Sequence, residues 1–130
     1  EETLAYFREF RGEDFRWTFT CRESLSKAYA QAGRYSEAET ELRVILERYA
    51  ELEPIHHAGR IKLQLYKMLH FQGRRDEALM VAKEAVDFSQ GYKNGPDVIT
   101  RGVVAWYRAR GDDASADEMQ RFYEELTANR

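Results

Sequence analysis

The sequence predicts an all-α fold, a solenoid of three helix–turn–helix repeats that follow a short N-terminal capping helix. The first observation is a pattern that occurs three times, in which a Gly is followed five residues later by an Ala. The pairs are Gly33 with Ala38, Gly73 with Ala78, and Gly111 with Ala116. The second observation is that apolar residues precede each Gly by four and by eight residues, which is the spacing of one helix face. Such internal repetition is typical of stacked helical repeats.

The first copy of the pattern shows what one unit should look like. Leu25, Tyr29 and Gly33 form a ladder of four-residue steps along one helix. Gly then ends this helix, because it adopts the left-handed conformation at little cost. Hydroxyl and acidic residues after the Gly suit the start of a second helix, and Ala38 opens it where the two helices approach closely. Since one helix pair cannot bury its apolar face alone, neighbouring units must stack to form the core.

The expected elements cover a single domain of residues 1–130. A capping helix occupies 1–12 and ends at Gly12. The repeats span 14–50, 54–90 and 96–127, with helices expected at 14–32, 36–49, 54–72, 76–89, 96–110 and 113–127. Pro54 and Pro96 suit the first turn of a helix, where a missing N–H costs nothing. The stretch from Gly91 to Gly95 contains an Asn-Gly turn signal and reads as a linker.

These columns resemble the tetratricopeptide repeat (TPR), and the resemblance covers nearly the whole chain. It implies a TPR-like α-solenoid. The units, spaced 40 and 38 residues apart, are longer than the usual repeat of about 34 residues, and the early Trp and late Pro of the consensus are missing. Long units resemble the repeats of kinesin light chains and of helical-repeat sensor domains in bacterial transcription regulators. The first two units also resemble the bacterial transcriptional activation domain.

The resemblance implies that the first helices of successive units line a concave groove that binds extended or helical peptides. Offsets from each Gly place nine groove candidates: Lys27, Gln31, Arg60, Gln64, Lys67, His70, Phe71, Arg101 and Arg108. A basic stripe on a chain of net charge -3 favours an acidic peptide or a terminal carboxylate. The alternative is that these cations form an ordinary solvated helix face. The carboxylate clamp of chaperone-cochaperone TPR proteins is not reproduced, because Glu23, Gln64 and Gly102 occupy matching positions.

The last helix has no following unit to cover it. Its apolar residues are Met119, Phe122, Tyr123 and Leu126, and they cannot all face the preceding helix. An exposed strip of this kind would mark a homodimer contact or a surface covered by a further unit. The alternative is a narrow strip that is mostly buried internally.

The sequence argues against catalysis, metal binding and cofactors. His57 and His70 are 13 residues apart, which is about 20 Å along a helix, so they cannot share an ion. Cys21 falls on the apolar ladder and is expected to be a buried, inert thiol. Neither a Gly-rich phosphate loop nor a Ser-His-Asp order is present. Gly102 lies within a helix, where it would admit a ligand backbone or simply pack against another helix.

The leading functional hypothesis is therefore a cytoplasmic scaffold that binds a partner protein or peptide and is not an enzyme. The acidic balance argues against direct binding of nucleic acid, and the chain has no apolar run long enough to span a membrane. Two alternatives remain open. One is the regulatory part of a bacterial transcription regulator, in which the repeats gate a separate DNA-binding domain. The other is a self-assembly module that dimerises through its last helix.

Overall fold

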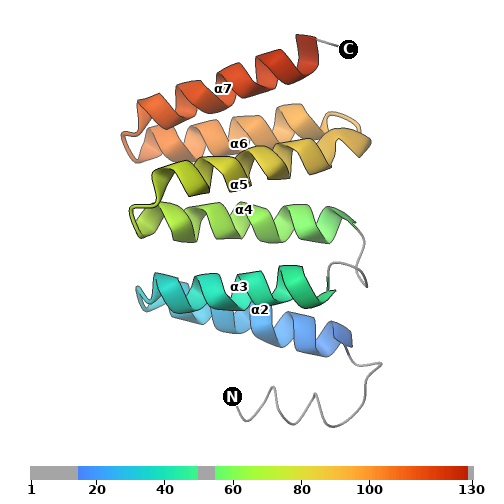
Figure 1. Ribbon diagram of the computed structural model, residues 1–130, viewed down its shortest axis with the longest axis vertical. Coiled ribbons are helices and arrows are strands. Elements are labelled where there is room, and N and C mark those ends of the chain that lie inside the picture. Colours follow the sequence, from blue (N-terminus) through green and yellow to red (C-terminus); the bar gives the residue numbers. More distant parts are fainter. Residues whose placement is uncertain (1–14, 50–54, 129–130) are drawn as a thin grey trace.

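The computed structural model describes residues 15–49 and 55–128, and the side chains of 19–48 and 59–128. Six α-helices and one 3₁₀ turn occupy these residues, and no strand occurs among them. The helices are α2 (Phe15–Gln31), α3 (Tyr35–Tyr49), α4 (Ile55–Phe71), α5 (Arg75–Phe88), α6 (Gly95–Ala109) and α7 (Asp113–Ala128), with η2 (Ser89–Gly91) between α5 and α6. They stack in chain order from α2 to α7 (Figure 1). The predicted all-α helical-repeat fold is confirmed.

All six described helices begin and end within one residue of the expected limits. Helix α2 pairs with α3, α4 with α5, and α6 with α7, while α3–α4, α5–α6 and α5–α7 contacts join the repeats. The capping helix expected at 1–12 lies outside the described residues. None of the helices in the described ranges is long and apolar enough to cross a membrane.

The turn inside each of the three repeats has the same backbone geometry. Gly33, Gly73 and Gly111 have φ of 78°, 78° and 76°, in the left-handed region that a side chain would strain. The residue after each Gly donates its N–H to the carbonyl four residues before the Gly. These bonds run from Arg34 to Tyr29 at 2.8 Å, from Arg74 to Leu69 at 3.0 Å, and from Asp112 to Tyr107 at 3.0 Å. They satisfy carbonyls at the end of the first helix and turn the chain into the second.

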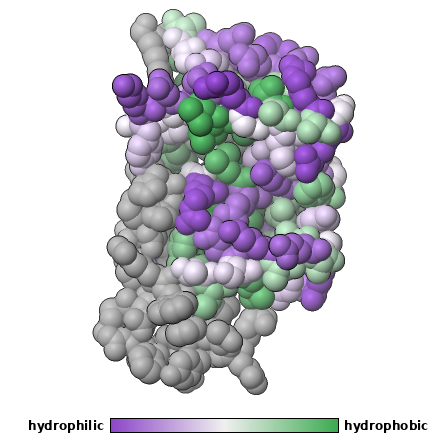
Figure 2. All heavy atoms as spheres, turned by 180° about the vertical axis from the view of Figure 1, so that it is seen from behind, coloured by the Kyte–Doolittle hydropathy of each residue, from purple (hydrophilic) through white to green (hydrophobic). Residues whose placement is uncertain are grey.

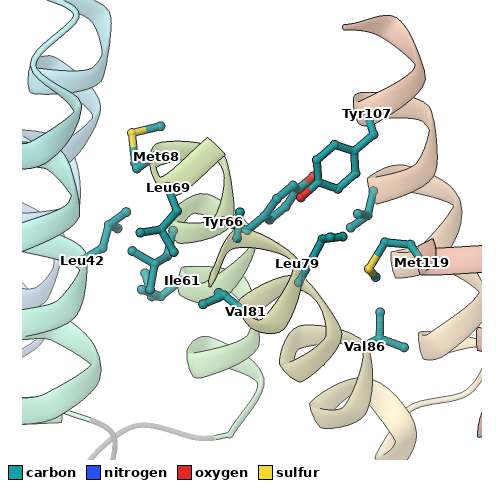
Figure 3. Close-up of a cluster of buried hydrophobic side chains, with 14 of the residues drawn as sticks. Leu42, Ile61, Tyr66, Met68, Leu69, Leu79, Val81, Val86, Tyr107 and Met119 are labelled. Carbon is teal, nitrogen blue, oxygen red and sulfur yellow. The ribbon is translucent and has the colours of Figure 1, made fainter. Parts of the chain in front are cut away.

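The core lies between the helices of each pair and between neighbouring pairs. Ala38, Ala78 and Ala116 have no exposed surface, as expected for residues at a close helix approach. Large buried residues from α3 to α7 fill the space around them, and Figure 3 shows Tyr66 of α4 and Tyr107 of α6 pointing toward one another across a repeat junction. Their ring centroids are 5.7 Å apart. The core is therefore continuous through the solenoid.

The connection between α5 and α6 is tightly folded. Asn94 has a φ of 60° and directly precedes α6. A Cβ atom added to Gly95 would lie 2.2 Å from the carbonyl oxygen of Ser89. Only Gly therefore fits at this point without a shift of the backbone. The expected linker is present and holds the start of α6 against the end of α5.

Two residues differ from expectation. Cys21 is partly exposed and not fully buried, because its place on α2 lies at the edge of the apolar face. An added Cβ at Gly102 would meet no atom within 4 Å. Packing against another helix therefore does not explain this Gly.

Exposed apolar surface is unevenly distributed. On the face shown in Figure 2, hydrophobic residues gather in the upper half between hydrophilic ones. Among the described side chains, the large hydrophobic ones with substantial exposure are Phe71, Met80, Phe88, Tyr92 and Val98.

Candidate functional site

The candidate site is a groove along one face of α4. Arg60, Leu63, Gln64 and Lys67 recur at three- and four-residue steps and therefore share this face. The structure has a hollow on each side of it. We call them the first hollow, which α2, α3 and α4 form, and the second hollow, which α4, α5, η2 and α6 form with the chain that joins α5 to α6.

The first hollow has a volume of about 200 Å³ and brings three sequence-predicted residues together. It is lined by Lys27 of α2 and by Gln64 and Lys67 of α4, together with the apolar side chains of Leu42 and Met68. Lys27 is exposed and makes no ion pair with any other residue in the described ranges. Two ammonium groups and an amide thus border a small apolar floor, which suits a ligand with both acidic and apolar parts.

Lys67 lies between the first hollow and a group of aromatic rings. Its Nζ is 5.8 Å from the centroid of the Trp106 ring. Burial, followed by the positive charge of Arg110, lowers the pKa of Lys67. Its ammonium is therefore less well solvated than that of an exposed lysine, and a carboxylate brought close to it would relieve this penalty.

Glu23 holds two of the predicted groove residues in place. This carboxylate is 7% exposed. It accepts hydrogen bonds from Arg60 and, at 2.7 Å, from Nε2 of Gln64. The guanidinium of Arg60 also lies 5.8 Å from the ring centroid of Phe19. Arg60 is therefore partly neutralised, and Glu23 connects α2 to α4 at the base of the groove.

His70 and Phe71 belong to an aromatic cluster at the far end of α4. Phe71 stacks on Tyr35 with centroids 4.6 Å apart, and both His70 and Phe71 meet Trp106 edge-on at 5.0 and 5.7 Å. The Arg110 guanidinium lies 4.0 Å from the centroid of Trp106. The sequence pattern indicated only His70 and Phe71. The four-residue step from Trp106 to Arg110 could have identified these two further members.

The second hollow is larger, with a volume of about 310 Å³. Phe88, Tyr92 and Val98 border it and are 37%, 48% and 54% exposed. Arg60 and Lys93 are the cations among its lining residues. Tyr92 and Lys93 were expected only as part of a linker. The sequence signal that could have indicated this hollow was an aromatic residue next to a cation in a turn between two glycines.

The remaining groove candidates line neither hollow. Arg101 is exposed and pairs with Asp97 of its own helix at 2.8 Å. Arg108 pairs with Asp117 at 2.9 Å and with Asp113 at 3.4 Å, so its side chain faces α7. Gln31 is exposed at the end of α2.

The structure corrects the expectation for one residue of the last helix. Met119 has no exposed surface and is part of the core, so it cannot contact a second copy. Phe122 and Leu126 pack partly against the core, and Nζ of Lys83 lies 5.7 Å from the Phe122 ring centroid. Tyr123 is half-buried. Helix α7 directs its Met inward because α5 and α6 offer it a complementary apolar surface.

No group of three or more His, Cys, Asp or Glu side chains in the described part of the chain is placed to hold a metal ion. The side chain of His57 lies outside the described residues.

Comparison with known families gives one match. A sequence model described as a tetratricopeptide repeat matches residues 18–58, which span most of α2, all of α3 and the first residues of α4. No curated protein and no solved structure matches the chain. The match confirms the resemblance to this repeat, whose members typically act as non-catalytic scaffolds for other proteins. The regulator and self-assembly alternatives, and a cytoplasmic location, stay predictions.

Proposed function

Residues 18–58 match the tetratricopeptide repeat, and on that premise we propose that the chain binds an acidic segment of a partner protein in the groove along α4. The observation that carries this proposal is the convergence of Lys27, Gln64 and Lys67 on one hollow. These side chains come from two different repeats. Only the stacked solenoid brings them together, so the groove is a property of the fold.

The chemistry of the first hollow favours a carboxylate next to a small apolar group. Two ammonium groups attract the carboxylate, and the amide of Gln64 can hydrogen-bond to the ligand backbone. Each exposed ion pair is worth only about 0.2–1 kcal/mol. Binding would therefore depend on several such contacts along the groove and would weaken as salt screens them.

A selection of displayed peptides against the protein tests the proposal. Peptides obtained with the unmodified chain would be measured against the double variant Lys27→Glu/Lys67→Glu. The matched control is Arg48→Glu/Arg121→Glu, which makes the same change in net charge at exposed positions of α3 and α7. We expect acidic peptides that the groove variant loses and the control retains.

Circular dichroism of both variants checks that the helices remain. Retention of the selected peptides by the groove variant, or equal loss in the control, would refute the assignment of the groove. A selection that yields no acidic peptides would refute the proposed ligand.

A further inference from the structure

The second hollow has the features of a separate small-molecule site. It reaches from the surface of α4 and α6 inward to Ala85 of α5, which is 2% exposed. Its volume of about 310 Å³ has room for about ten water molecules at roughly 30 Å³ each. This lies at the lower end of the size range for ligand pockets. It thus has room for a small ligand.

The lining of this hollow is apolar at its centre and basic at its edge. Leu63, Val98, Ile99, Phe88 and Tyr92 supply aliphatic and aromatic surface. Lys93 supplies positive charge, whereas the guanidinium of Arg60 is bonded to Glu23. No residue that lines the hollow within the described ranges is acidic. Three of the large hydrophobic side chains that remain notably exposed on this protein, Phe88, Tyr92 and Val98, border this one hollow.

The exposure of so much apolar surface to water around one hollow is unfavourable in free energy. A matching ligand would remove this surface from water. The walls are also held in place without the ligand, because the turn before α6 is close-packed at Gly95 against Ser89. A pre-formed site loses little conformational freedom on binding.

We propose that the second hollow binds a small apolar carboxylate, with its hydrocarbon part against Leu63, Phe88 and Val98 and its charge toward Lys93. This is a second binding activity and does not depend on the peptide site. The two hollows lie on opposite sides of the α4 face.

Octanoate is the test ligand, and amide resonances of glycines report its position by NMR. Gly59 and Gly95 line the second hollow. Gly33, Gly73 and Gly111 sit in the turns within repeats, at the opposite ends of the helices from the α5–α6 connection (Figure 1). We expect saturable shifts at Gly59 and Gly95 and none at the turn glycines. Octanol and octylammonium, of matched chain length, should bind more weakly because they lack the negative charge.

Variants then test the charge and the location. Lys93→Glu should weaken octanoate binding about tenfold, while Lys93→Arg retains it. Arg121→Glu makes the same change in net charge at an exposed residue of α7 that does not line the hollow, and it should leave binding unchanged.

The absence of saturable shifts, equal binding of octylammonium, or an unchanged affinity in Lys93→Glu would overturn the proposal. The groove variant Lys27→Glu/Lys67→Glu separates this proposal from the peptide site. It should lose acidic peptides and keep octanoate. If the unmodified chain binds the peptides but not octanoate, only the small-molecule proposal fails.

Discussion

The turn before α6 allows a sharp test of the structure by a single methyl group. In Gly95→Ala the new Cβ would lie 2.2 Å from the Ser89 carbonyl oxygen, 3.1 Å from its carbonyl carbon and 3.0 Å from its Cβ. Two of these atoms belong to the backbone, so no rotation of a flexible side chain relieves the contact. Either η2 or the start of α6 must move.

The cost can be estimated from similar overpacked sites. Forcing a methylene-sized group into a well-packed region costs about 1–3 kcal/mol. A contact with fixed backbone belongs at the upper end of this range. We therefore expect Gly95→Ala to lower the free energy of unfolding by about 2–3 kcal/mol.

The same helix provides the matched control. Gly102 also lies in α6, and an added Cβ there would meet nothing within 4 Å. Ala is favoured over Gly in a helix interior by about 1 kcal/mol. Gly102→Ala should therefore stabilise the protein, so one substitution made at two places in one helix has opposite effects.

Urea denaturation followed by circular dichroism measures both effects. The midpoint should fall for Gly95→Ala and rise for Gly102→Ala, with little change in the slope. The described packing would be wrong if Gly95→Ala kept the midpoint of the unmodified protein. It would also be wrong if Gly102→Ala lost stability, since that result would mean a hidden contact.

Two further predictions concern stability. Gly73→Ala should cost about 1–2 kcal/mol in the same denaturation assay, because the φ of 78° at this turn strains a side chain; an unchanged midpoint would contradict the left-handed turn. Glu39 should make stability depend on pH. Burial, the largest influence, raises its pKa, but hydrogen bonds from Arg43 and Gln72 and the charges of Arg43 and Arg74 outweigh it, so the pKa lies below its usual value of 4.5. Its contribution is therefore present above pH 4.5 and is lost as pH falls through the lowered pKa. Glu39→Gln should be less stable than the unmodified protein near neutral pH, and the difference should narrow in acid; a constant difference would refute this role.

The sequence was informative about the fold because local rules determine most of it. A Gly at the end of one helix and an Ala at the start of the next fix both helix limits within a residue or two. The four-residue ladder then shows which side faces the core. Tyr107 and Leu69 are fully buried for this reason. These features depend on neighbours in the chain, so they can be recognised without a structure.

The candidate site was less predictable because it depends on side chains from separate repeats. Lys27, Gln64 and Lys67 were predicted because each lies at a groove position that is defined by its distance in sequence from the Gly of its own repeat. Arg108 was misleading, since its offset could not show that Asp113 and Asp117 of α7 would engage it. The second hollow was missed because its walls come from three helices and a turn. Such a concavity has no signature in any one segment.

The two junctions between repeats include different kinds of contact on the side of the groove. Between the first and second repeats, Glu23 of α2 holds Arg60 and Gln64 of α4 by polar contacts. Between the second and third, aromatic rings meet, as in the pair of Tyr66 and Trp106 with centroids 5.3 Å apart. Dissolved ions screen charges, whereas apolar contacts weaken on cooling. Added salt should therefore weaken these polar contacts at the first junction, whereas cooling should weaken these apolar contacts at the second.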